Sequence, residues 1–194
     1  MRKTIRALSS FVLLTGLALL IAGLDIIVRA WHGQNEAARK WTRGKVVVED
    51  KGFRLGDTIG RLTIPRLNAG MFVIEGDGES QLSSGPGHLA DTPLPGNRGN
   101  TVIAGHRDTH FRLLKDLQPG DEVLIESRGS QFLYRVREMK VVKPDHTEVL
   151  QPTEEETLTL ITCYPFYYSG HAPKRYIVRA DRVYEPQARA ASAD

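Results

Sequence analysis

The hydrophobic pattern divides the chain into one long apolar segment near the N-terminus and a region of short alternating runs. The apolar segment extends from Ser9 to Val28 and has no charged residue between Phe11 and Leu24. As a helix, these about 20 residues would be roughly 30 Å long, which matches the hydrocarbon thickness of a bilayer. Basic residues at positions 2, 3 and 6 precede the segment, and they favour a cytoplasmic N-terminus. We therefore predict a basic cytoplasmic tail at residues 1–8 and a transmembrane signal anchor at residues 9–30.

Two other interpretations of the apolar segment remain open. The uncharged run is about 14 residues long, which also suits the hydrophobic region of a cleaved signal peptide. No clear pair of small residues at a cleavage spacing follows the run, and this favours the uncleaved anchor. The third possibility is a helix buried inside a soluble domain. Asp25 would be costly at the centre of a bilayer, but it would lie near the outer boundary, where the cost is much smaller.

The rest of the chain is dominated by short strand-like runs between turn residues. Their ranges are 45–49, 58–64, 71–75, 101–104, 122–126, 131–142, 157–162 and 175–180. Eight short strands without long helical patterns between them favour a β-barrel or β-sandwich over an alternating βαβ fold. Helical patterns are short, at residues 79–83, 111–117 and 146–150. The predicted fold class is all-β, preceded by one transmembrane helix.

These patterns also give the expected domain boundaries. Residues 31–56 are interpreted as a polar stalk and the first strand, and residues 57–184 as the β-domain. Within that domain, residues 84–100 are rich in Gly, Pro and Asn and are interpreted as a packed loop. Residues 185–194 are rich in Ala, Arg and Asp, which predicts a disordered tail.

Charge and cysteine content exclude several classes of protein. The formal net charge of +3 is too small to indicate nucleic-acid binding, for which a clustered basic face is expected. A single cysteine excludes a disulfide within the chain and any CxxC motif. The histidines are not spaced with this cysteine as ligands of a zinc site. We expect neither a metal ion nor another cofactor.

The single cysteine is the first candidate for chemistry. Cys163 ends the run Thr157–Thr162, in which Leu158 and Leu160 share one face. Because side chains alternate along a strand, Cys163 is expected on the other face, towards a groove or solvent. An unpaired thiol outside the cytoplasm is exposed to oxidation, which suggests that it has a function. The alternative is a buried structural cysteine that acts as a small hydrophobic residue.

Two further candidates also lie at strand ends. His106 follows the run 101–104, and Arg175 opens the run 175–180. Taken singly, each is more typical of a loop histidine or a solvated arginine. Together with Cys163 they supply a thiol nucleophile, a base or acid, and a cation that favours the thiolate or an oxyanion. This combination predicts nucleophilic acyl transfer without a metal.

These residues carry a family resemblance. Thr159–Cys163 reads T-L-I-T-C and matches the TLxTC signature of the sortases, the cysteine transpeptidases of bacterial surfaces. Gly105-His106 resembles the family's histidine site, and Arg175 resembles its essential arginine. The segment Gly105–Phe111 and the aromatic run after Cys163 are most similar to class D sortases. The resemblance covers residues 57–183 approximately.

The resemblance implies an eight-stranded sortase-type β-barrel and a two-step reaction. Cys163 would attack the carbonyl after the threonine of an LPxTG-like sorting signal and form a thioacyl intermediate. His106 would act as acid and base, Arg175 would hold the oxyanion or the substrate backbone, and Thr162 is a weaker candidate for substrate positioning. The implied partners are proteins with sorting signals and an amine nucleophile, such as a cell-wall precursor or a protein lysine. The implied location is the outer side of the plasma membrane, with a single-pass anchor.

Three alternatives were compared with this interpretation. An L,D-transpeptidase would have Gly immediately before the cysteine and Arg two residues after it, where this chain has Thr162 and Pro165. A papain-like peptidase places its cysteine before its histidine, and the order here is reversed. The alternative from a different class is an extracytoplasmic binding or scaffolding β-module with a structural cysteine.

Overall fold

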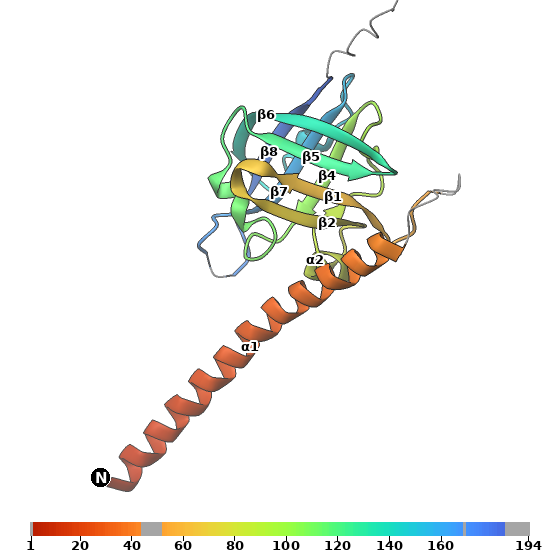
Figure 1. Cartoon of the computed structure of the whole chain (residues 1–194). Coiled ribbons are helices and arrows are strands. Elements are labelled where there is room, and N and C mark those ends of the chain that lie inside the picture. The colour runs from red at the N-terminus through yellow and green to blue at the C-terminus, as the bar shows by residue number, and fades with distance from the viewer. Residues whose placement is uncertain (1, 44–51, 169, 185–194) are drawn as a thin grey trace, which may run out of the picture.

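A closed barrel of eight strands follows a long N-terminal helix in the computed structural model, which describes residues 2–43, 52–168 and 170–184 (Figure 1). Around the barrel the strand order is β1-β2-β3-β4-β7-β8-β6-β5. The strands are β1 (Thr58–Ile64), β2 (Ala69–Glu75), β3 (Gly87–His88), β4 (Asn100–Gly105), β5 (Glu122–Ser127), β6 (Ser130–Val142), β7 (Thr157–Tyr164) and β8 (Lys174–Val183). The predicted all-β, eight-stranded barrel with a preceding apolar helix is confirmed.

The pairing of the strands decides which loops meet. Strands β2 and β3 pair in parallel, as do β4 and β7, and the other pairs are antiparallel. Because β4 and β7 are parallel neighbours, their C-terminal ends lie at the same end of the barrel. Strand β8 is antiparallel to β7 and therefore begins at that end. Residues far apart in the sequence are thus brought to one rim.

The core is filled by alternating side chains of the strands. Its fully buried members include Leu62, Val123, Tyr134, Leu158 and Val178. Close packing of these side chains in the barrel interior provides the main stabilising contribution, because burying apolar area is favourable at roughly 25 cal/mol per Å². The rim that carries the ends of β4 and β7 is consequently held by a rigid scaffold.

Two features differ from the strand pattern expected from the sequence. Strand β3 lies within residues 84–100, which we expected to be only a packed loop. It has two residues and is recognisable only by its pairing with β2 and β4. The predicted run at residues 45–49 lies outside the described residues. The short helices are η1 (Pro65–Leu67), α2 (Glu79–Ser84), η2 (Arg112–Asp116) and η3 (Thr147–Leu150).

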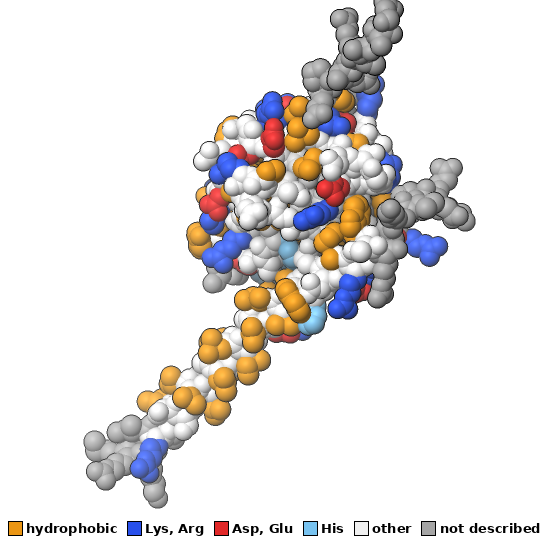
Figure 2. Space-filling view, viewed as in Figure 1, with side chains coloured by type: hydrophobic (Ala, Val, Ile, Leu, Met, Phe, Trp, Pro, Cys, Tyr) orange, Lys and Arg blue, Asp and Glu red, His pale blue; other side chains and the backbone are white. Residues whose placement is uncertain are grey.

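The N-terminal helix α1 spans Arg2–Arg43 and is long and apolar enough to cross a membrane. Figure 1 shows that it extends away from the barrel, and Figure 2 shows hydrophobic side chains along the projecting part. The segment expected to be a polar stalk forms its last turns in residues 33–43. These turns pack against β2 and α2, where Ala37 is buried and the ring of Trp41 lies 6.2 Å from that of Phe72.

Hydrogen bonds fix this contact as well. The Gln34 amide nitrogen donates to the carbonyls of Phe72 and Ser84, both at 3.1 Å, and its oxygen accepts from the Phe72 N–H at 2.7 Å. Gly33 faces Ser84 so closely that an added Cβ would lie 2.4 Å from the Ser84 Cα. The C-terminal part of α1 is therefore docked on the barrel by hydrogen bonds from Gln34 to backbone groups and by the close packing of Gly33 on Ser84.

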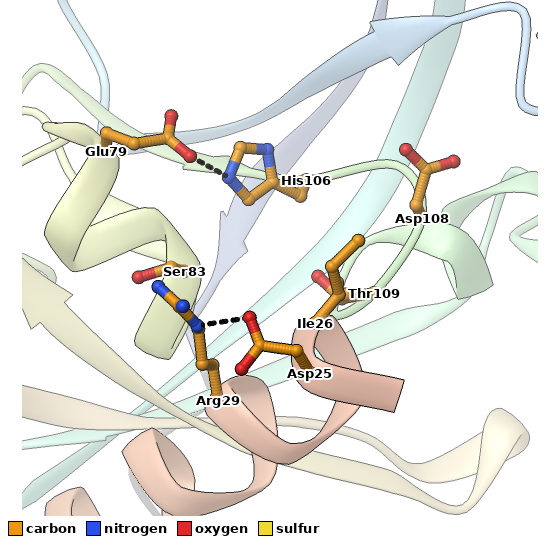
Figure 3. A pocket seen from close by; sticks show the side chains of 8 residues that line it. All are labelled: Asp25, Ile26, Arg29, Glu79, Ser83, His106, Asp108 and Thr109. Atoms are coloured by element: carbon orange, nitrogen blue, oxygen red, sulfur yellow. Dashed lines mark ion pairs between the residues drawn. The ribbon is translucent and has the colours of Figure 1, made fainter. Parts of the chain in front are cut away.

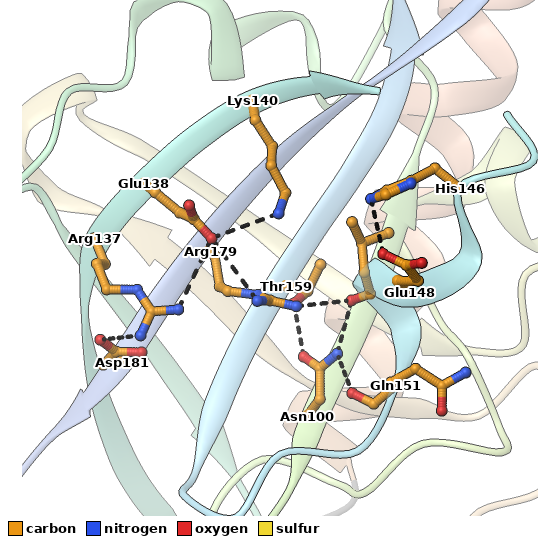
Figure 4. A network of polar contacts seen from close by, with 11 residues as sticks. Asn100, Arg137, Glu138, Lys140, His146, Glu148, Gln151, Thr159, Arg179 and Asp181 are labelled. Carbon is orange, nitrogen blue, oxygen red and sulfur yellow. Dashed lines mark hydrogen bonds and ion pairs between the residues drawn. The ribbon is translucent and has the colours of Figure 1, made fainter. Parts of the chain in front are cut away.

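A polar network ties η3 to β4, β7 and β8 (Figure 4). The Asn100 amide donates to the carbonyls of Val149 and Gln151, and its oxygen accepts from the Thr159 hydroxyl at 2.6 Å. The guanidinium of Arg179 donates to the Val149 carbonyl. Thr159 is fully buried as a result, although the alternation places it on the same strand face as Cys163. That face is covered at the middle of β7 and opens only towards its end.

Candidate active site

The three residues singled out from the sequence occupy neighbouring positions at one rim of the barrel. His106 directly follows β4, whose last residue Gly105 pairs with Thr162 of β7. The next residue of β7, Cys163, pairs with Arg175 of β8. Adjacent strands lie about 4.8 Å apart, so the three backbone positions span roughly 10 Å. Direct antiparallel partners also place their side chains on the same face of the sheet.

Cys163 is placed where the covered face of β7 becomes open. Leu158 and Leu160 point into the core and are almost fully buried, as the alternation predicts. Cys163 is an unpaired, partly exposed thiol. Thr162 is buried, and its hydroxyl donates to the Gly105 carbonyl at 2.7 Å. This bond ties the cysteine strand to the histidine strand, while contact of Thr162 with a substrate stays a prediction.

A tight turn positions His106. Its carbonyl accepts hydrogen bonds from the N–H groups of Thr109 and Phe111, at 3.4 and 3.1 Å. The buried Phe111 ring packs over Gly105, where an added Cβ would lie 2.7 Å from the ring. Glycine is required there because a larger residue would displace the ring that holds the turn. The imidazole is 37% exposed, and its Nε2 lies 3.7 Å from Glu79 Oε1.

Arg175 is partly buried at the start of β8. One of its guanidinium nitrogens donates to the carbonyls of Ala172 and Lys174, at 3.2 and 3.1 Å. Its neighbour Lys174 is exposed. The side chain of Arg175 therefore helps to hold the end of the loop between β7 and β8 that precedes it.

Aromatic side chains cluster next to Cys163 and Arg175 in the sequence. Tyr164 stacks on Tyr176 with ring centroids 6.2 Å apart, and Phe166 meets Tyr176 edge-on at 5.2 Å. Phe166 and Tyr176 also pack against the core. Burial, followed by the proximity of Tyr164, raises the pKa of Tyr176. The aromatic run that follows Cys163 thus begins with rings that pack on one another, and Phe166 also packs against the core.

Arg107 is a site residue that the sequence argument missed. Its side chain is 8% exposed and donates to the carbonyls of Tyr168 and Gly170, at 2.7 and 3.1 Å. It therefore ties the turn after His106 to the loop between β7 and β8. The only signal in the sequence was a charged residue next to a candidate histidine. Asp108 lies 3.6 Å from the Arg107 Nε, and η2 has no side-chain cap.

A second histidine of this turn is largely buried. Burial, and then the charge of nearby His106, lower the pKa of His110 to about 4, whereas a backbone hydrogen bond with Ala30 of α1 acts in the opposite direction. His110 is therefore neutral over most of the physiological range. Residues of α1 line a pocket together with His106, so α1 passes beside this rim.

The other histidines lie apart from the site. His88 is buried against Glu75, and His146 lies 3.5 Å from Glu148 near η3. His171 is exposed on the loop between β7 and β8. Within residues 2–43, 52–168 and 170–184, no three His, Cys, Asp or Glu side chains form a group suited to a metal ion.

A pocket beside His106 includes residues that the sequence analysis did not connect with the site. Asp25, Ile26 and Arg29 of α1 line it together with residues of α2 and of the turn after β4 (Figure 3). The spacing of Asp25 and Arg29, one helical turn apart, was visible in the sequence. What the sequence did not show is that α1 continues past the apolar segment and folds against the barrel.

Comparisons with known proteins agree with this arrangement. The model of the Sortase domain family matches residues 62–183. Sortase D of Bacillus subtilis is 40% identical over 129 residues, which cover 66% of this chain and 65% of the relative. Sortase SrtE1 of Streptomyces coelicolor is 31% identical, with coverage of 74% and 47%. The chain thus spans less than two thirds of the length of these two relatives.

Solved structures show the same likeness. A Sortase D5 transpeptidase of Clostridium perfringens superposes with a TM-score of 0.66 and 30% identity, covering 80% of this chain and 99% of that one. Sortase C-1 of Actinomyces oris has a TM-score of 0.60 and 32% identity, with coverage of 66% and 76%.

Proposed function

The chain belongs to the sortase family, and from this membership we propose that it is a membrane-anchored cysteine transpeptidase. Its donor substrate is a protein with an LPxTG-like sorting signal, and its acceptor is a primary amine. The observation that supports the proposal is the strand pairing, in which Gly105, the residue before His106, pairs with Thr162, and Cys163 pairs with Arg175. The partial exposure of Cys163 supports a reactive thiol over a buried structural one.

In the first step, the Cys163 sulfur attacks the carbonyl carbon after the threonine of the sorting signal. His106 takes the thiol proton, and a tetrahedral oxyanion forms. When the peptide C–N bond breaks, His106 passes this proton to the departing amine, and a thioester remains on Cys163. Arg175 is the donor for the oxyanion, and its hydrogen bonds to the carbonyls of Ala172 and Lys174 hold it near the rim.

Trapping the thioester tests this function. The full-length protein in detergent micelles is incubated with a library of LPxTG-type peptides, and the intact mass is measured after rapid acidification. We expect an acyl adduct on Cys163 of the wild-type chain and none on Cys163→Ala. The matched control is Ser127→Ala, which replaces a buried hydroxyl far from the rim and should keep the adduct. Peptide turnover that persists in Cys163→Ala would instead favour a binding module with a structural cysteine.

We propose further that α1 spans the plasma membrane with the barrel on its outer side. Its length and apolar composition support a span, and the basic residues before it favour a cytoplasmic N-terminus. Cys163 is the single thiol of the chain, so a membrane-impermeant maleimide reports the orientation directly. We expect labelling in intact protoplasts. Labelling that requires permeabilisation would contradict the proposed orientation.

A further inference from the structure

The pocket beside His106 has a volume of about 410 Å³ and is built from three separate parts of the chain. Figure 3 shows His106 between the residues of α2 and those of the turn after β4, with α1 closing the remaining side. Its lining residues are Asp25, Ile26 and Arg29 of α1, Glu79 and Ser83 of α2, and His106, Asp108 and Thr109. One wall of the pocket at the proposed general base is therefore the N-terminal helix.

That wall is held in place by contacts outside the pocket. Gln34 makes three hydrogen bonds to the barrel and α2, and Ala37 is buried beneath the last turns of the helix. Since α1 is one continuous helix through these residues, its docking fixes Asp25 and Arg29 relative to His106.

The polar groups in the pocket retain capacity for a ligand. Asp25 and Arg29 form an ion pair at 2.8 Å and largely neutralise each other. The 3.7 Å separation of His106 Nε2 and Glu79 Oε1 is too long for a good hydrogen bond. Asp108 is two-thirds exposed, and its ion pair among the described residues is with Arg107 at 3.6 Å. With carboxylates at 25, 79 and 108 and one arginine at 29, the lining favours a cation.

We infer that this pocket receives the acceptor amine as its ammonium form, and that Asp25 and Arg29 of α1 determine its specificity. The inference rests on the proposed function, which requires an amine to resolve the thioester. A cavity at the side of His106 places the amine between the carboxylates and the group that removes its proton. Part of the acceptor site is thus supplied by the helix that anchors the protein.

The second step then balances as follows. His106 takes one proton from the ammonium, and the free amine attacks the thioester carbonyl. The C–S bond breaks, an amide C–N bond forms, and a second proton moves from nitrogen to the Cys163 sulfur. His106 finally releases its proton to water, so the thiol and the neutral imidazole are restored.

The test measures aminolysis by the full-length protein in lipid nanodiscs, with an LPxTG-type peptide as donor. The charged probes are Nα-acetyl-lysine amide, with an ε-ammonium, and glycine amide, with an α-ammonium; the probe with the lower KM identifies the type of acceptor. Hydroxylamine serves as the uncharged nucleophile at pH 7.5. For the charged probes we expect Asp25→Asn to raise the KM about tenfold and Arg29→Gln to lower it severalfold, because the two changes shift the pocket charge in opposite directions.

The matched control is Glu36→Gln, which removes the other i,i+4 ion pair of α1, with Lys40, outside this pocket. It should leave every KM unchanged, and the KM for hydroxylamine should be the same in all variants. Equal KM values for the charged probes in wild type, Asp25→Asn and Arg29→Gln would overturn the inference. So would parallel losses with hydroxylamine, since these would indicate a structural role.

A binding measurement separates this inference from the proposed function. In full-length Cys163→Ala, which cannot form a thioester, the His106 imidazole signals are followed by NMR in detergent micelles during titration with Nα-acetyl-lysine amide. We expect a saturable shift that weakens in Asp25→Asn. Absence of a shift would refute the amine site even if peptide adducts form on the wild-type chain. Absence of peptide adducts together with a saturable shift would refute only the transpeptidase function.

Discussion

Two histidine–glutamate pairs lie close together in this molecule and differ in almost every physical property. His88 and Glu75 join the ends of β3 and β2, with Nδ1 2.8 Å from Glu75 Oε2, and both side chains are buried. His106 and Glu79 are 3.7 Å apart, and their side chains are 37% and 88% exposed. The two glutamates are separated by one short turn between β2 and α2.

In the buried His88–Glu75 pair, the histidine has hydrogen-bond partners on both ring nitrogens. Nε2 of His88 lies 3.2 Å from the Pro93 carbonyl, which can only accept, and 3.2 Å from the Thr92 hydroxyl. Both ring nitrogens of His88 therefore have protein partners, as a buried polar side chain requires. His106 has no such set of partners among the described residues. The comparison shows how environment separates the two pairs. Burial and satisfied hydrogen bonds make His88–Glu75 a structural contact, whereas the exposed and loosely paired His106 remains accessible to a substrate.

The sharpest test of this difference replaces His106. We expect His106→Ala to lower kcat/KM for transpeptidation about 10³-fold, because the proton transfers of both steps lose their carrier. Stability should change by less than about 0.5 kcal/mol, since the side chain is partly exposed and loosely paired. Steady-state kinetics and thermal unfolding of the same preparation check both parts. A large drop in melting temperature would show that His106 is also a structural residue.

The buried pair should respond in the opposite way. Glu75→Gln leaves His88 without its charged partner inside the barrel, so we expect a loss of about 3 kcal/mol in the free energy of unfolding. Activity per folded molecule should stay near the wild-type value. Urea unfolding, together with kinetics corrected for the folded fraction, measures the two effects. Unchanged stability would contradict the structural role of this pair.

His110 lies between these extremes, and its effect depends on pH. Its folded-state pKa of about 4 lies below the unfolded value near 6.5, so the unfolded chain binds the proton first on acidification. The contribution of neutral His110 to the free energy of unfolding is therefore fully present above about pH 6.5, and it is lost as the pH is lowered towards 4. After allowance for partial exposure, we expect a loss of about 2 kcal/mol between pH 7 and pH 4.5.

Unfolding of His110→Asn at the two pH values measures this contribution. The variant should be destabilised less by acid than the wild type, because asparagine does not titrate. His171→Asn is the control, since His171 is exposed on the loop between β7 and β8, and it should keep the wild-type pH dependence. Equal acid sensitivity of wild type and His110→Asn would exclude His110 as the source.

The smallest expected effect is the change in the free energy of unfolding when the exposed His106–Glu79 pair is altered. Glu79→Gln should change the free energy of unfolding by less than about 0.5 kcal/mol, as is usual for an exposed ion pair. The same chemical change at Glu75 is expected to cost several times more, so the two variants form a matched set. Measurement of both in one urea series tests the comparison directly. Similar losses in the two variants would remove the distinction between them.

The strand pattern of the sequence indicated a β-barrel or β-sandwich, and the resemblance to the sortases implied the eight-stranded barrel that the structure shows. Leu158 and Leu160 indicated the core face of β7, and strand ends indicated where His106, Cys163 and Arg175 lie. It did not predict β3, because two residues carry no periodicity and their pairing is formed by distant strands. The catalytic roles of His106, Cys163 and Arg175 stay predictions until the thioester is tested.

The sequence also did not predict the docking of α1. The contact is made by Gly33, Gln34 and Ala37, a glycine, a polar residue and a small residue, rather than by an apolar stripe. Such a face is not distinguishable from a solvated helix by hydrophobic pattern alone. The tie between Arg107 and the loop after Cys163 was hidden for the same reason, since its partners are backbone carbonyls.

The continuity of α1 sets a geometric rule for the whole protein. If α1 spans a membrane as proposed, a flexible linker would let the barrel sample many heights and orientations above the lipid, whereas a docked 42-residue helix acts as a rigid support. Each residue inserted between Val28 and Gln34 would turn the lower part of the helix by about 100° and displace it by about 1.5 Å. An insertion of about seven residues, close to two full turns, would bring Asp25 back to within about 20° of its original direction around the helix axis. The number of residues between Val28 and Gln34 therefore sets both the direction in which Asp25 points around the helix axis and its distance from the docked part of the helix.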